Sequence, residues 1–132
     1  MNNNFLKIKD YVTELEYTIV NESESDSILI VEAEESGVKN LVLGCEEPIL
    51  IMEQYITDVD SRSSEIYVEL LKKNRDIIHG AFVLDESGKK LIFRDTLQLE
   101  NLDLNELEAS INSLSLLLSE YSTELINISK IK

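Results

Sequence analysis

The residues that could support catalysis in this chain are few and scattered. It has a single histidine, His79, and a single cysteine, Cys45, so sites built from several such residues are excluded. No serine occupies a Gly-x-Ser-x-Gly turn, and the four glycines form no phosphate-binding loop. An enzyme would need carboxylates acting together in a pocket, such as Glu32, Glu34 and Glu46, which on strands more simply form a solvated face. The sequence therefore predicts a protein without enzymatic activity and without a cofactor.

One segment imitates the start of a calcium-binding loop. It reads Asp58-Val59-Asp60-Ser61-Arg62-Ser63, and Glu69 stands at the twelfth position of the pattern. However, Arg62 stands where an oxygen ligand belongs, and Ser63 replaces the glycine that the sharp turn of such a loop requires. We therefore interpret the segment as a polar loop that caps the next helix, and we predict no metal site.

Acidic residues dominate the composition. Against 12 Lys and Arg stand 26 Asp and Glu, which gives a formal charge of −14. The imbalance is uneven, because Lys39 is the only basic residue between Asp10 and Asp60. Such a chain repels phosphate backbones, so nucleic acid is not an expected partner. Two interpretations of the charge stay open, namely simple solubility and an acidic docking surface for a basic partner.

Length and apolar content predict one domain, residues 1–132. The chain is 43% hydrophobic, which is typical of a folded globular protein. One cysteine allows no internal disulfide and fits a reducing compartment. The N-terminus lacks the features of a signal peptide, and no apolar run approaches the roughly 20 residues that span a bilayer. We expect a cytoplasmic protein without membrane insertion.

The first half of the chain reads as one helix followed by three strands. A stripe with spacings of three and four residues predicts an amphipathic helix, whereas the acidic, serine-rich run 21–27 reads as a loop. Three short apolar runs, 27–33, 38–44 and 48–56, predict an antiparallel meander. These runs are apolar on both faces, so helices, a second subunit or a client chain should cover both. The helical stripe consists of Phe5, Ile8, Val12, Leu15 and Ile19.

The second half reads as helix, two strands and helix. A helix reaches Asn74, strands at 80–85 and 89–96 flank a hairpin turn that ends in Gly88, and a long helix follows Asp103. Asp103 and Glu106 have the spacing of a capping box. The predicted fold is α+β, with the order α-β-β-β-α-β-β-α and an antiparallel five-stranded sheet packed with helices. The buried stripe of the last helix is Leu104, Leu107, Ile111, Leu114, Leu118, Tyr121 and Leu125, widened by Leu116 and Leu117.

Several short motifs accompany this order of elements. They are Leu70-Leu71-Lys72-Lys73-Asn74, Gly80-Ala81-Phe82-Val83-Leu84-Asp85, Gly88-Lys89-Lys90-Leu91-Ile92-Phe93, Leu97-Gln98-Leu99 and Leu102-Asp103. With them the chain resembles the class I chaperones of type III secretion, the Tir-chaperone family, and their YbjN-like relatives. The resemblance implies a homodimer that holds the N-terminal segment of a protein client, such as a secreted effector, in extended form. An alternative within the same fold is a YbjN-like regulatory or stress protein that binds a folded partner.

The expected contact residues are apolar rather than reactive. The resemblance places the dimer contact on the second helix, and the first helix and first predicted strand are the candidates for client contact. For each of these residues, a place in the ordinary core is the alternative. The dimer-contact candidates are Ile66, Tyr67, Leu70 and Leu71, and the client-contact candidates are Phe5, Ile8, Val12, Leu15, Ile28 and Ile30.

Overall fold

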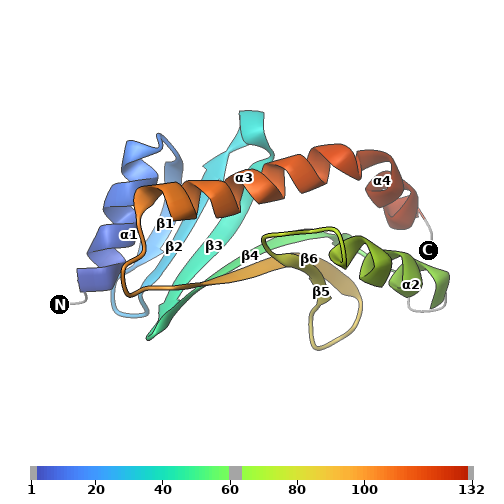
Figure 1. Cartoon of the computed structure of the whole chain (residues 1–132), viewed down its shortest axis with the longest axis horizontal. Coiled ribbons are helices and arrows are strands. Elements are labelled where there is room, and N and C mark those ends of the chain that lie inside the picture. The colour runs from blue at the N-terminus through green and yellow to red at the C-terminus, as the bar shows by residue number, and fades with distance from the viewer. Residues whose placement is uncertain (1–2, 60–63, 131–132) are drawn as a thin grey trace.

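The computed structural model describes residues 3–59 and 64–130. Six antiparallel strands form one sheet in the order β1-β2-β3-β4-β6-β5, and the helices pack on one of its faces (Figure 1). The α+β class is confirmed, with one strand more than predicted. The elements are α1 (Asn3–Glu14), β1 (Thr18–Ser23), β2 (Ile28–Ala33), a 3-10 turn (Glu34–Ser36), β3 (Val38–Glu46), β4 (Ile49–Asp58), α2 (Ser64–Asn74), β5 (Ala81–Leu84), β6 (Lys90–Gln98), α3 (Leu104–Glu120) and α4 (Ser122–Lys130).

The sixth strand, β1, replaces part of the predicted first helix and part of the predicted loop. The helix ends early because Tyr17 N–H donates to the Val12 carbonyl and Glu16 N–H donates to the Thr13 carbonyl, with Glu16 at φ 65°. This is the Schellman arrangement, which usually places glycine at the left-handed position. Because glutamate occupies it here, the sequence carries no visible stop signal. Ile19 therefore lies in β1, where it pairs with Val31.

The three predicted strands of the meander and the later hairpin are confirmed. β2, β3 and β4 pair antiparallel in succession, and β6 then pairs with β4 so that β5 becomes the outer strand. The turn between β5 and β6 is closed by Gly88 N–H donating to the Asp85 carbonyl over 3.0 Å. Ser87 Oγ also donates to the Asp85 carboxylate, which lowers the pKa of that group.

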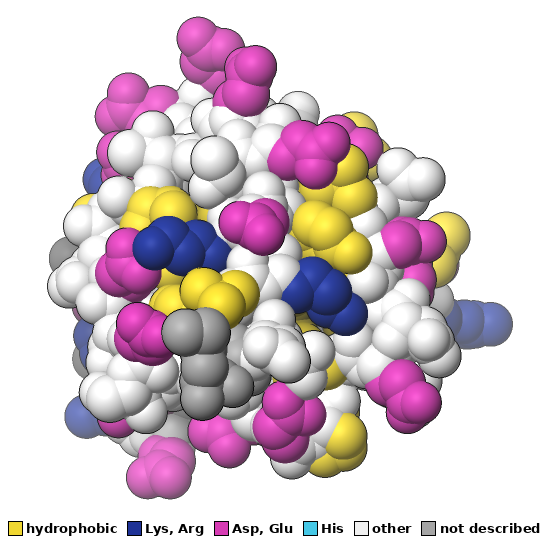
Figure 2. Space-filling view, turned by 90° about the vertical axis from the view of Figure 1, so that its left-hand side faces the viewer, with side chains coloured by type: hydrophobic (Ala, Val, Ile, Leu, Met, Phe, Trp, Pro, Cys, Tyr) yellow, Lys and Arg dark blue, Asp and Glu magenta, His cyan; other side chains and the backbone are white. Residues whose placement is uncertain are grey.

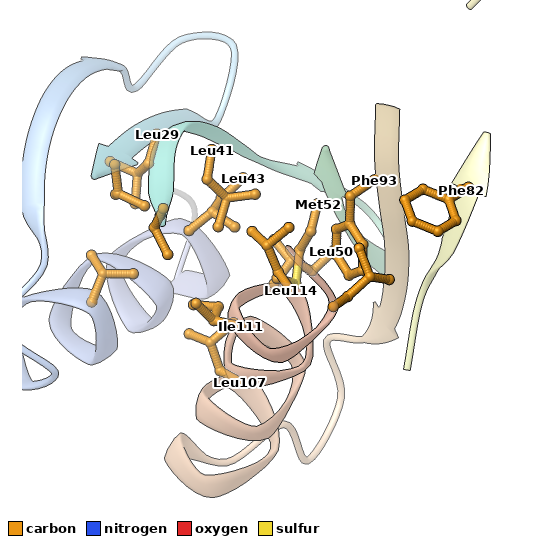
Figure 3. Packing of buried hydrophobic residues seen from close by; sticks show 14 of the residues in the cluster. Leu29, Leu41, Leu43, Leu50, Met52, Phe82, Phe93, Leu107, Ile111 and Leu114 are labelled. Carbon is orange, nitrogen blue, oxygen red and sulfur yellow. The ribbon is translucent and has the colours of Figure 1, made fainter. Parts of the chain in front are cut away.

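The core lies between the helices and the face of the sheet that carries Leu29, Leu43 and Met52 in one cross-strand row. Ile111 and Leu114 of α3 point toward this face (Figure 3). We call it the inner face and the opposite one the outer face. Side chains alternate between the two along each strand, which explains the regular alternation of buried and partly buried positions in β2 and β4.

The predicted last helix is interrupted. Asp103 caps α3 as expected, since its carboxylate accepts from Glu106 N–H over 2.7 Å. Tyr121 then leaves helical geometry, and α4 starts at Ser122. The bend places Tyr121 6.1 Å from the Phe82 ring and returns Leu125 to the core. The predicted burial of Leu116 is wrong, because this side chain is 69% exposed.

Candidate protein-binding surfaces

An apolar patch occupies the middle of the outer face. Two cross-strand rows build it: Ile28 pairs with Gly44, which pairs with Ile51, and in the next row Ile30 pairs with Val42. All four apolar side chains are only partly buried in the single chain. This outer patch (Ile28, Ile30, Val42, Gly44, Ile51) therefore offers apolar area at the centre of a sheet rather than at its margin.

Gly44 leaves a gap between the side chains of the outer patch, which we call the depression at Gly44. A Cβ atom built on Gly44 would meet nothing within 4 Å, so the space above its backbone is open. The isoleucines paired with it on either side, Ile28 and Ile51, form the walls of this depression. A glycine inside a strand weakens it and often marks a place where another chain approaches the backbone. The backbone of the outer patch is therefore accessible at Gly44.

Charge borders the outer patch on the side of β6. Arg94 donates to the Glu53 carboxylate over 2.6 Å, and this pair continues the row of Ile30 and Val42. Acidic side chains are spread widely over the end of the molecule shown in Figure 2, where hydrophobic side chains form only small, separate groups. At this end of the molecule, the acidic residues expected from composition are therefore spread over the surface and not gathered in one patch.

The client-contact candidates fall into two groups. Phe5, Ile8 and Val12 are at most 2% exposed, because α1 packs them against the sheet. Helix α1 also holds the linker after β6, since Lys7 Nζ donates to the Leu99 carbonyl over 2.8 Å. These three side chains belong to the core of the single chain, where they hold α1 in position. The candidates left partly accessible are Leu15, Ile28 and Ile30.

The dimer-contact candidates divide in the same way. Ile66 and Leu70 are buried in the core, whereas Tyr67 is partly buried and Leu71 is 70% exposed. An apolar groove of about 250 Å³ runs between α2 and β5 beside these residues. Sequence reasoning missed two exposed side chains of this region, Val68 and Leu84. Val68 follows the candidate Tyr67 directly in the sequence, whereas no sequence signal marked Leu84 as exposed. The groove is lined by Tyr67, Leu70, Leu71, Asn74, Phe82, Val83, Leu84 and Leu91.

Asn74 closes part of the free edge of the sheet. Its side-chain amide donates to the Phe82 carbonyl over 3.0 Å and accepts from Phe82 N–H over 2.8 Å. Since β5 is one of the two outer strands of the sheet, these two bonds take the place that a further strand would fill. The asparagine of the motif that ends the second helix therefore has a physical explanation, because its side-chain amide carries both the donor and the acceptor that these two bonds need.

The reactive groups of the chain offer little chemistry. Burial raises the pKa of the Cys45 thiol to about 11, so the reactive thiolate is scarce near neutral pH. Within the described ranges 3–59 and 64–130, no group of three or more His, Cys, Asp or Glu residues could hold a metal ion. Residues 60–63 of the calcium-like pattern lie outside these ranges. Of its flanking residues, Asp58 lies 3.6 Å from Lys90, and Glu69 lies within 4 Å of Lys72 and Lys73.

A polar hollow of about 490 Å³ lies where α1 ends and the 3-10 turn begins. Glu16, Glu32, Glu34 and Glu35 line it together with Tyr17. Burial, assisted by the nearby Glu108 carboxylate, raises the pKa of the Tyr17 hydroxyl. The hollow adds to the acidic character of this end of the molecule.

Family and fold comparisons agree with this arrangement. The family model CesT_Tir_1, which describes type III secretion chaperones, matches residues 1–131. The chain belongs to the CesT_Tir_1 family. Among curated proteins, none matches the chain in sequence. None of the described helices is both long and apolar enough to cross a membrane.

Solved structures show that this member of the CesT_Tir_1 family has the fold predicted from its motifs. YbjN from E. coli superposes with a TM-score of 0.70 at 12% identity, covering 91% of this chain and 92% of YbjN. A chain of the HopA1–SchA chaperone–effector complex gives 0.66 at 14% identity, covering 90% and 94%. A chain of the complex between the Yersinia pestis type III secretion chaperone SycH and a fragment of YscM2 gives 0.57 at 17% identity, covering 96% and 100%.

Proposed function

We propose that the protein is a non-enzymatic, cytoplasmic, homodimeric chaperone that holds an extended segment of a protein client against its outer patch. Family membership supports the chaperone role. Two structures of the same fold are complexes, one a chaperone–effector complex and one a secretion chaperone with a fragment of YscM2. The homodimer is proposed to form through the groove between α2 and β5.

The depression at Gly44 is the observation that carries this proposal. Side chains of an extended segment alternate, so every second one can face the sheet and insert between Ile28 and Ile51. Burial of apolar area contributes roughly 25 cal/mol per Å², so one well-seated side chain contributes substantially to affinity.

The substitution Gly44→Val tests the proposal. The client is first isolated by co-purification with the tagged protein from its native cells, and its bound segment is then produced as a peptide for calorimetry. Valine fills the depression without strain, because open space lies above Gly44. We expect about tenfold weaker binding or more, equivalent to about 1.4 kcal/mol, with an unchanged or higher urea midpoint.

The matched control is Thr18→Val, which places the same side chain at an exposed position of β1. This variant should bind the segment like the wild type. Equal affinity of Gly44→Val and wild type would show that the client does not use the depression, and the proposed site would be wrong.

The fold match with YbjN, a proposed transcription regulator, favours one alternative. In this alternative the protein binds a folded partner. Limited proteolysis of the purified complex separates the two functions. A client segment held in extended form becomes sensitive to protease outside the contact and is protected within it, whereas a folded partner resists throughout.

A further inference from the structure

A second apolar hollow lies on the helix-covered side of the sheet, away from the outer patch. It measures about 470 Å³ and opens between the turn that follows α2 and the flank of α3, which lie next to each other (Figure 1). Two large hydrophobic side chains protrude from its walls, with Ile78 90% exposed and Leu116 69% exposed. We call this hollow the α3 cleft.

The turn that carries Ile78 is held in place by several contacts. Ser113 Oγ of α3 donates to the His79 carbonyl over 2.9 Å, and the neighbouring Ile77 packs against the core. Gly80 lets the chain pass close to β6, because a Cβ atom there would lie 2.4 Å from the Phe93 ring. Ile78 is therefore exposed on an anchored turn. An apolar side chain held in this way is typical of a binding surface.

Carboxylates border the α3 cleft. Asp76 and Glu120 line it, and Glu124 follows on α4. Burial, together with these three carboxylates, raises the pKa of the Tyr121 hydroxyl, as expected where the local potential is negative. The nearby Lys73 is already engaged, since its ammonium group lies 5.0 Å from the centre of the Tyr121 ring and 3.9 Å from Glu69.

We propose that the α3 cleft binds a segment of a second partner protein in which large apolar side chains stand next to Lys or Arg. The apolar side chains would cover Ile78 and Leu116, and the basic ones would pair with Asp76 and Glu120. The carboxylates Asp76 and Glu120 at the border of the α3 cleft favour a partner segment of positive charge. This site goes beyond the proposed client surface and lies on the opposite side of the sheet.

Three matched synthetic peptides test the proposal by NMR titration of the full-length protein. The first combines leucines with lysines, the second replaces the lysines by glutamate, and the third replaces the leucines by alanine. We expect the first peptide to shift amide signals of residues 76–79 and 109–121. We expect the other two peptides to bind at least about tenfold more weakly than the first. The affinity of the first peptide should fall when salt is added.

The variant Leu116→Asp adds the decisive comparison. Leu116 is exposed, so the fold should tolerate aspartate there, and circular dichroism checks this. Binding of the first peptide should be lost in Leu116→Asp and retained in the control Val20→Asp, which changes another exposed hydrophobic side chain, 48% exposed on β1. Signals that shift only on the outer face, or equal binding to Leu116→Asp, would overturn the proposal. Self-association of the wild type that Leu116→Asp abolishes would also overturn it, because the α3 cleft would then join two copies of this chain.

Discussion

The side chain of Asn74 hydrogen-bonds to the main chain of β5 in the place of a neighbouring strand. An outer strand presents unpaired main-chain groups that can recruit another chain, and proteins commonly protect such edges. Here one side-chain amide satisfies both main-chain groups of Phe82. Asn74 also lines the groove between α2 and β5. Both polar atoms of its amide are bonded to Phe82, and these bonds prevent strand pairing at that residue.

The substitution Asn74→Leu should destabilise the protein. Leucine has a similar size but leaves the partly buried Phe82 N–H and carbonyl without their partner, which costs about 1–3 kcal/mol. Urea unfolding measures this loss, and analytical ultracentrifugation should detect added self-association through the freed edge. The control Asn105→Leu, at an exposed position of α3, should change the free energy of unfolding by no more than about 0.5 kcal/mol. Equal stability of the two variants would show that the Asn74 amide contributes nothing.

At the scale of elements, the start of α3 depends on one cap. Asp103 accepts from Glu106 N–H, and α3 supplies Leu107, Ile111 and Leu114 to the core. Asp103→Ala should therefore lower the free energy of unfolding by about 1 kcal/mol, because one main-chain donor of the first turn loses its partner. Asp103→Asn keeps an acceptor at the cap and should stay within about 0.5 kcal/mol of the wild type in the same urea experiment. If both variants match the wild type, the cap is not a determinant of α3 stability.

At the scale of the whole molecule, the proposed homodimer depends on Leu71 rather than on its buried neighbour Leu70. Leu71→Asp should produce a monomer with unchanged helix content, because a carboxylate in the apolar groove opposes association without disturbing the core. Light scattering coupled to size exclusion measures the mass, and Leu116→Asp is the control that should remain dimeric. A monomeric wild type, or a dimer unaffected by Leu71→Asp, would rule out this interface.

The predictions that succeeded depend on neighbouring residues in the sequence. The capped start of α3, the hairpin that ends in Gly88 and the strands β2 to β4 follow from periodicity and turn chemistry over a few residues. The predictions that failed depended on a helix-ending turn without its usual glycine and on contacts between distant segments. Ile19 matches the period of α1, yet Glu16 ends that helix and Ile19 pairs with Val31. Similarly, no residue pattern around Tyr121 predicts the bend there, which places the Tyr121 ring near Phe82.

The order of amino acids alone was enough to predict the α+β class, the order of most elements, the acidic charge and the family motifs. These properties follow from composition and from hydrogen bonding and periodicity over short spans. Which apolar side chains a partner can reach is known only from the folded arrangement, since the same stripe of α2 contains buried Leu70 and exposed Leu71. The physical reason is that exposure depends on what other segments pack against each face of an element. For the same reason, the depression at Gly44 and the edge bonds of Asn74 became visible only when the strands were placed side by side.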